Sequence, residues 1–238
     1  METKIEGMKV PYEVRVSEEA SRPRIDHKLG NFTVVLPEEA EENSEDLLVK
    51  KKDWVLKKRK EFLRFKRKIP DRNLEEGGKI SLLGDKKEIT IEKRRSNKVS
   101  DKVYLAEHLV NRTSLEDQLE KLLREECRRI VEERVEKYSD QVSEEYDRVF
   151  IRDQETRWGS CSSRGNLNFN WRLILGPEHV LEYVVVHELV HLEEQNHNEK
   201  FWSRVREIYP NYKKSNRWLS ENSSKLVFSK EKLDAFSS

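Results

Sequence analysis

The chain has 238 residues, of which 35% are hydrophobic and 39% are charged, and its formal net charge is only +1. A chain of this length can bury the core of one large domain or of two small ones. With positive and negative charges balanced, the protein has no overall electrostatic attraction for nucleic acid or an anionic membrane. No segment approaches the roughly 18 consecutive apolar residues that a membrane-spanning helix needs.

The first third of the chain predicts a small β-rich region. The segments MKVPYEVRV, RPRIDHKLG and NFTVVLP alternate in part between apolar and polar residues and are separated by turn-forming residues. Such short segments are typical of strands in a small meander. Two later segments, KISLLG and KKEITIEKRR, are punctuated by Gly77, Gly78 and Gly84 and predict two further strands.

A basic amphipathic helix is expected between these groups of strands, over residues 47–68. Val55, Phe62 and Ile69 recur every seven residues, as on the buried face of a helix. Residues 50–68 contain eleven Lys or Arg and two acids. This density fits a nucleic-acid contact driven by counterion release, but charge runs are more often solvated faces, and the acidic stretch 38–46 offsets this one. Nucleic acid is therefore a weakly supported partner.

The second half of the chain predicts a long helix followed by strands. Apolar residues recur at steps of three and four from Thr113 to about Tyr138, with Ser114 or Thr113 as the N-cap. The segments DRVFIRDQ and NLNFNWRLIL then read as strands. We expect a β-rich region with the basic helix at 1–110 and a metal-binding catalytic region at 111–238, or one continuous domain.

The two cysteines, Cys127 and Cys161, form no disulfide framework, and neither has a CxxC partner. A reducing compartment is the default for such a chain. The opening METKIEGMKVPYEV has no apolar signal core. These features predict a soluble, cytoplasmic protein with no membrane partner.

The stretch HELVHLEEQNH, residues 187–197, holds three of the six histidines of the chain. His187 and His191 are four residues apart on an apolar helical segment, so both imidazoles leave the same helix face and can reach one ion. Glu188 points about 100° away, close enough to touch a metal-bound water without being a ligand. The alternative is a pair of core histidines with satisfied hydrogen bonds.

The third histidine can join the site only if the helix ends before it. The polar run 193–196 offers a place to stop, with Asn196 tolerating the left-handed conformation and Asn198 capping the next helix. His197 would then swing back as a third ligand, with Glu207 as the alternative. Three protein ligands leave the fourth position of one Zn²⁺ ion to water, as in catalytic sites.

At these residues the sequence resembles a known family. RWGSCSSRGNLNFNWRLILGP followed by YVVVHELVHLEEQNHNEKFW is similar to the YgjP-like metallopeptidases, which are related to the SprT-type zincins. The match covers most of residues 10–220. It implies an α+β, zincin-like fold with the HExxH helix packed under an antiparallel sheet. It also implies His187, His191 and His197 as zinc ligands and Glu188 as the catalytic base. Glu194 stands where the metzincin signature has glycine.

The RWGSC block suggests a substrate-facing edge strand near the metal helix. Gly159 would allow close approach there, and Arg157, Trp158 and Arg172 are candidates for binding substrate or stabilising developing charge. The alternative makes the tryptophans core anchors and Arg157 half of a structural ion pair. Cys161 is expected to be a small buried residue rather than a ligand or nucleophile.

These patterns favour a zinc-dependent hydrolase of metallopeptidase type, in which Glu188 activates the metal-bound water. The alternative is a metal-dependent nucleoside triphosphate pyrophosphatase using the same site, with arginines for a polyphosphate. A third hypothesis is a nucleic-acid-associated protease. The oxyanion-stabilising residue stays open, and so does the choice between peptide and nucleotide substrates. The candidates for the oxyanion are Arg157, Tyr183, Tyr209 and Tyr212, and the arginines in question are Arg157, Arg164 and Arg172.

Overall fold

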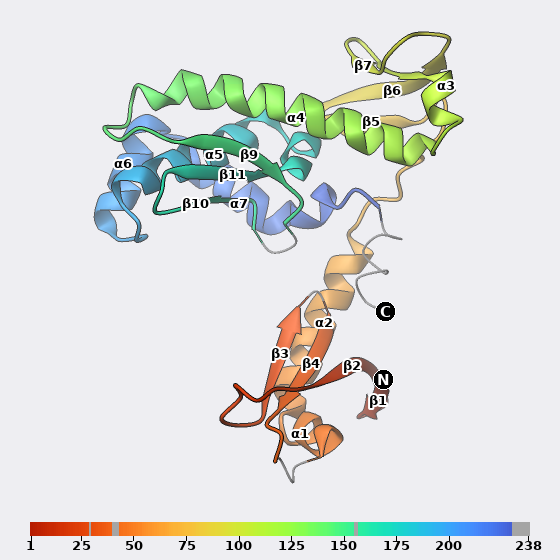
Figure 1. Ribbon diagram of the computed structural model, residues 1–238, viewed down its shortest axis with the longest axis vertical. Coiled ribbons are helices and arrows are strands. Elements are labelled where there is room, and N and C mark those ends of the chain that lie inside the picture. The colour runs from red at the N-terminus through yellow and green to blue at the C-terminus, as the bar shows by residue number, and fades with distance from the viewer. Residues whose placement is uncertain (29, 40–42, 155–156, 230–238) are drawn as a thin grey trace. The chain divides into compact units, whose positions relative to one another are not determined.

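The computed structural model describes all residues except 29, 40–42, 155–156 and 230–238 (Figure 1). The chain divides into two compact units. Unit 1 comprises Met1–Ile69 and Ser229, and unit 2 comprises Pro70–Phe228. The boundary between the two units thus follows residue 69, whereas the sequence predicted a boundary near residue 110.

Unit 1 contains a four-stranded sheet in the order β1-β2-β4-β3. Strands β2 and β4 are parallel, and β3 pairs antiparallel with β4 on its other side. The predicted meander is therefore wrong, because β3 does not pair with β2. Instead, β4 lies between β2 and β3 and pairs with both. The strands are β1 (Glu2–Ile5), β2 (Met8–Val16), β3 (Arg24–Lys28) and β4 (Asn31–Leu36).

Two helices follow in unit 1, α1 (Ser44–Lys50) and α2 (Lys52–Arg67). The helix predicted over 47–68 is interrupted at Lys51, whose φ of −103° and ψ of 22° leave the helical region. Helix α2 buries Val55, Leu56 and Phe62, as its seven-residue spacing predicts, and exposes most of its lysines. The basic residues thus form a solvated face of unit 1, and a nucleic-acid contact there stays a prediction.

Unit 2 begins with a second four-stranded sheet, in the order β5-β6-β8-β7. The long helix α4 contacts β7 and β8 of this sheet and β9 of the next one (Figure 1). This shared helix explains why residues 79–106 belong with the C-terminal region. The elements are β5 (Lys79–Leu82), β6 (Asp85–Glu92), β7 (Lys98–Val99), β8 (Val103–Ala106), α3 (Glu107–Val110) and α4 (Leu115–Ser139).

Helix α4 starts where its capping pattern predicts. The Ser114 hydroxyl accepts a hydrogen bond from the Asp117 backbone N–H at 3.0 Å and donates to the Asp117 carboxylate at 2.7 Å. This arrangement satisfies one of the free N–H groups at the start of the helix. The apolar stripe of α4, which includes Leu119, Leu123 and Val131, is fully buried in the core of unit 2.

The third sheet has the order β10-β11-β9 and lies against α5. Strands β10 and β11 are antiparallel, but β11 and β9 are parallel, so the expected antiparallel sheet is a mixed one. The predicted strand NLNFNWRLIL is also shorter than expected, since residues 171–175 form a 3-10 turn. The elements are β9 (Arg148–Arg152), β10 (Gly159–Cys161), β11 (Asn166–Asn170) and η1 (Trp171–Leu175).

Four helical elements complete unit 2: α5 (Glu178–Glu193), α6 (Glu199–Ile208), α7 (Tyr212–Asn222) and η2 (Ser223–Leu226). Helix α5 contacts α4, α6, α7 and strand β10, which places it at the centre of the unit. Within the described part of the chain, the helices are all too short or too polar to cross a membrane.

Candidate metal centre

Helix α5 carries two of the three clustered histidines. Pro177 is its N-cap and Glu178 lies in its first turn, so the proline lies one position before the helix starts. The helix buries residues on nearly all of its faces, as its apolar composition predicts. A helix held on all sides gives His187 and His191 fixed positions one turn apart.

The turn after α5 brings His197 back to the helix. Glu194 ends α5 in an extended conformation, with φ −136° and ψ 103°. Asn196 is not in the left-handed region, which among the described non-glycine residues holds only Glu6 and Leu83. The predicted reversal of the chain after α5 is thus present, but the residue that leaves the helical conformation is Glu194. The Asn198 side chain accepts a hydrogen bond from the Phe201 N–H at 3.0 Å and caps α6 as predicted.

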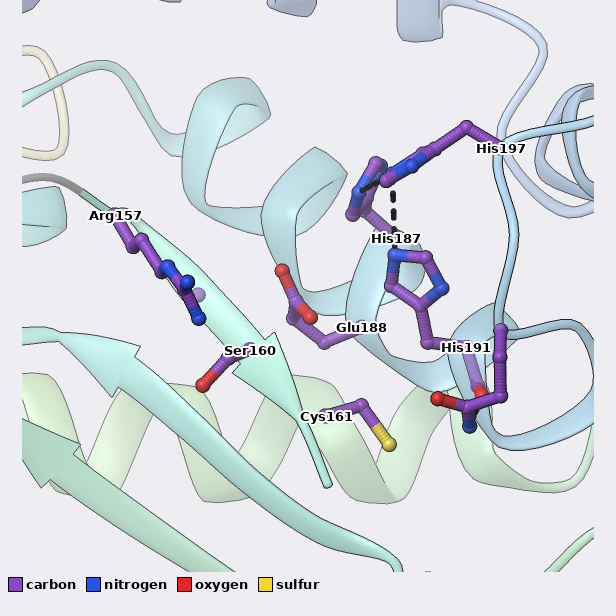
Figure 2. A pocket seen from close by; sticks show the side chains of 9 residues that line it. Arg157, Ser160, Cys161, His187, Glu188, His191 and His197 are labelled. Carbon is purple, nitrogen blue, oxygen red and sulfur yellow. Dashed lines mark hydrogen bonds between the residues drawn. The ribbon is translucent and has the colours of Figure 1, made fainter. Parts of the chain in front are cut away.

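The three histidines converge on one point (Figure 2). The Nε2 atom of His197 lies 3.0 Å from that of His187 and 3.2 Å from that of His191. In a tetrahedral site, zinc–nitrogen distances of about 2.0–2.1 Å place ligand nitrogens roughly 3.3–3.4 Å apart. The observed spacing therefore fits a single ion of this kind, and the three residues form a candidate metal site.

The hydrogen bonds of the imidazoles also suit a cation. Nδ1 of His191 lies 3.0 Å from the Glu194 carbonyl oxygen, which can only accept, so Nδ1 carries the proton and the Nε2 lone pair is free. Burial and the neighbouring histidines lower the pKa of His187 to about 3. Burial likewise lowers the pKa of His191. The neutral imidazole is the form that binds a metal.

Glu188 lies beside the three histidines but outside their cluster (Figure 2). Its side chain is 5% exposed, and its Oε2 atom is buried without a hydrogen-bond partner in the described structure. Burial raises the pKa of this carboxyl to about 8, while the charge of Arg157 and the backbone N–H of Cys161 lower it. In its ionised form, which a cation at the three histidines would favour, this carboxyl has a free oxygen that can accept a proton from a small molecule in the cavity.

Strand β10 runs along the other side of Glu188. A methyl group placed on Gly159 would lie 2.5 Å from Oε1 of Glu188 and 2.7 Å from its Cγ. These distances are far shorter than carbon–carbon or carbon–oxygen contacts, so a side chain at position 159 and the present position of Glu188 exclude each other. A close approach to the backbone of Gly159 was predicted from the sequence, and the group that approaches it is the side chain of Glu188.

Two aromatic residues of α6 support the histidines and escaped the sequence analysis as site residues. The Phe201 ring lies 4.5 Å from the His191 ring and 4.7 Å from the His197 ring, between centroids. Trp202 lies 5.7 Å from His197. Phe201 and Trp202 lie three and four residues after Asn198 in NHNEKFW. Two aromatic residues in the first turn of the helix that follows His197 were the sequence signal that could have placed them at the site.

Two cavities open at this site. One has a volume of about 280 Å³ and includes the three histidines, Glu188 and residues of β10. The second, of about 230 Å³, extends toward α7. Arg157 and Gly159 line both cavities, and Trp158 lines the second. Of the candidate oxyanion partners, Arg157 and Tyr183 line a cavity.

The remaining predicted site residues lie elsewhere. Tyr209 donates a hydrogen bond to the His179 carbonyl at 3.1 Å, and Tyr212 stacks on Trp202. Glu207, the alternative third ligand, forms an ion pair with Arg204 at 2.8 Å. None of these three residues lines the two cavities.

Arg172 is part of a partly buried ion-pair network and lines neither cavity. Its guanidinium forms an ion pair with Asp153 and lies 5.3 Å from the centre of the Trp171 ring. Arg124 pairs with the same carboxylate at 2.5 Å and lies 5.0 Å from the same ring. Trp171 is fully buried and therefore belongs to the core, as the alternative prediction for the tryptophans stated. These contacts favour a structural role for Arg172 over the predicted role in substrate binding, which stays a prediction.

Arg172→Ala is therefore expected to reduce stability and to leave zinc content and turnover unchanged. The Arg172 side chain is only 15% exposed, and its removal leaves Asp153 with one partner instead of two. Loss of a charged, partly buried hydrogen bond costs about 1–3 kcal/mol in the free energy of unfolding. Urea denaturation checks this, with exposed Arg164→Ala as the control. Reduced turnover at unchanged stability would return Arg172 to the substrate.

Comparisons with known proteins place the chain in a family. The profile of the YgjP-like, metallopeptidase domain family matches residues 22–222. No curated protein matches. A similar solved structure is the crystal structure of the metallopeptidase zymogen of Pyrococcus abyssi abylysin, with 23% identity and a TM-score of 0.36, over 41% of this chain and 99% of that chain. The profile covers most of the chain, and the chain belongs to the YgjP-like metallopeptidase family.

Proposed function

We propose that this protein is a zinc-dependent peptidase whose site is formed by His187, His191, His197 and Glu188. The observation that carries the proposal is the convergence of three imidazole Nε2 atoms next to a buried carboxylate with a free oxygen. Imidazole donors suit zinc, and three protein ligands leave a position open for water and substrate. Membership of a metallopeptidase family supports the same choice.

The chemistry follows from the position of Glu188. When bound, zinc would lower the pKa of a water molecule and polarise a substrate carbonyl. Glu188 takes the proton from the attacking water as the new carbon–oxygen bond forms. It then delivers this proton to the amide nitrogen as the carbon–nitrogen bond breaks. Arg157, which lines both cavities, is the candidate we choose for stabilising the charge that develops on the carbonyl oxygen.

Strand β10 supports an extended peptide as the substrate. It is the edge strand of its sheet, and the Trp158 carbonyl and the Ser162 N–H bond to the two end residues of β11, Asn170 and Asn166. Backbone groups alternate in direction along an antiparallel strand, so those of Gly159 and Cys161 point to the open edge. The Cys161 N–H already donates to Glu188, which agrees with this direction and leaves the Gly159 backbone groups and the Cys161 carbonyl for a substrate. A substrate backbone can pair with this edge as an added strand.

Gly159→Ala tests the fit between β10 and Glu188. The added methyl group displaces the carboxylate, and a displacement of about 1 Å costs on the order of 100-fold in rate. We expect kcat to fall by that order while zinc content and KM change little. Steady-state kinetics and elemental analysis provide both measurements, with Ser163→Ala, at an exposed position outside both cavities, as the control. Wild-type kcat in Gly159→Ala would show that Glu188 acts from another position.

The nucleotide alternative finds less support. Of the three arginines considered for a polyphosphate, only Arg157 lines either cavity; Arg172 pairs with Asp153, and Arg164 lies outside both linings.

The substrate class can be tested directly with zinc-loaded protein. One aliquot is incubated with a mixed peptide library and another with a panel of nucleoside triphosphates, and mass spectrometry follows both. We expect new peptide termini that are missing in Glu188→Gln. Release of pyrophosphate that requires Glu188, without peptide cleavage, would replace the proposal with a nucleotide pyrophosphatase.

A further inference from the structure

The second cavity, of about 230 Å³, lies directly beside the metal centre. It shares Arg157, Gly159, His187 and Glu188 with the cavity that contains all three histidines. A group that occupies it is therefore next to the carboxylate that we assign as the base. Neither the binding of a metal ion nor the transfer of a proton by Glu188 requires this space, which leaves it for another part of a substrate.

The walls of this cavity are mainly apolar and come from three elements. Val184 and Tyr183 of α5 are 3% and 4% exposed, and Leu219 of α7 is 8% exposed. Trp158, which precedes β10, is partly buried and completes the walls. Such walls favour an apolar occupant, since burying apolar surface is the main source of binding energy in a site of this kind.

The charged groups of the cavity disfavour a charged occupant. Arg157 is exposed, and Glu188 is buried. An acidic or a basic side chain would lie next to both Arg157 and Glu188, so the attraction to one group is opposed by repulsion from the other. Removing a charge from water without a dedicated partner is costly. A glycine or alanine would leave the apolar walls without contacts.

We propose that this cavity is a side-chain subsite for a bulky uncharged residue, aliphatic or aromatic, immediately next to the peptide bond that is cut. The inference rests on the proposed peptidase function and adds a substrate preference to it. Leu219 sets the depth of the subsite. Asn216, which is exposed on α7, sets its rim. The position of these residues on α7 makes that helix the main determinant of specificity.

The experiment measures peptide affinity, so that it does not depend on turnover. Zinc-loaded Glu188→Gln protein is titrated with hexapeptides that differ only at one central position, which is Gly, Leu, Phe, Asp or Lys. Methyl NMR signals of Val184 and Leu219 report where the side chain binds. We expect the Leu and Phe peptides to bind at least about 10-fold more tightly than the others and to shift these methyl signals.

Three further variants, each made in the Glu188→Gln protein, locate the preference. Asn216→Trp narrows the rim and should abolish it, whereas Arg217→Trp, at an exposed neighbouring position outside the cavity lining, should preserve it. Leu219→Ala enlarges the subsite and should shift the preference from Leu toward Phe. Equal affinities for all five peptides, or a preference that Asn216→Trp and Leu219→Ala both leave unchanged, would overturn the proposal.

Cleavage of the same peptides by the wild-type protein separates this inference from the proposed function. Selective binding without any cleavage would retain the subsite and remove the peptidase. Cleavage without a preference for Leu or Phe would retain the peptidase and remove the subsite. Where cleavage occurs, the product masses show on which side of the cut bond the selected residue lies.

Discussion

Glu188→Gln is expected to lower the rate of peptide hydrolysis by about 10²–10⁴-fold while zinc remains bound. The amide is nearly the same size as the carboxylate and can still accept the hydrogen bond from the Cys161 N–H, so the packing against Gly159 is preserved. It cannot take a proton from water at neutral pH. Zinc is retained because the ligand set consists of the three histidines. Peptide turnover and zinc content, measured on the same preparation, check both parts.

A matched control is Glu194→Gln, which makes the same chemical change at the end of α5. The Glu194 backbone carbonyl orients His191, but its side chain is outside both cavity linings. This variant should keep the activity of the wild type. Activity in Glu188→Gln close to that of the control would remove Glu188 from the role of general base.

His197→Ala is expected to produce the second large effect, a loss of zinc. The substitution removes one of three converging nitrogens and leaves the Nε2 atoms of His187 and His191 without the third donor. The affinity should fall by more than the roughly 10–100-fold that follows loss of an outer-shell partner. Elemental analysis after dialysis against a weak chelator, together with a competition titration, measures the change.

His108→Ala is the control for His197→Ala, because His108 is an exposed histidine of α3 outside the cluster. It should bind zinc as the wild type does. Equal zinc content in both variants would place the third ligand elsewhere. Glu207 would then have to break its ion pair with Arg204 to reach the site.

The parts of the site that are close together in sequence could be predicted from the sequence. His187 and His191 are one helical turn apart, and this relation depends only on helix geometry. The caps at Ser114 and Asn198 are likewise made by side chains that bond to N–H groups three residues away. The reversal before His197 was expected from the polar run, although the residue that ends the helix is Glu194 rather than Asn196.

The parts that depend on distant segments required the tertiary structure. Strand β9 pairs parallel with β11, and an alternating pattern is the same for either direction of pairing, so the mixed sheet was not predictable. Arg172 resembled a substrate residue in sequence, and only the fold brings Asp153 to its guanidinium.

By itself, then, the sequence determined the three histidines, the glutamate and their family, because each of these relations spans a few residues of one helix and its turn. The tertiary structure decided what surrounds these residues. Gly159 packs against Glu188 from a strand that precedes it by almost thirty residues, and Leu219 closes the second cavity from a later helix. Contacts of this kind depend on how separate elements pack, and no local periodicity encodes them.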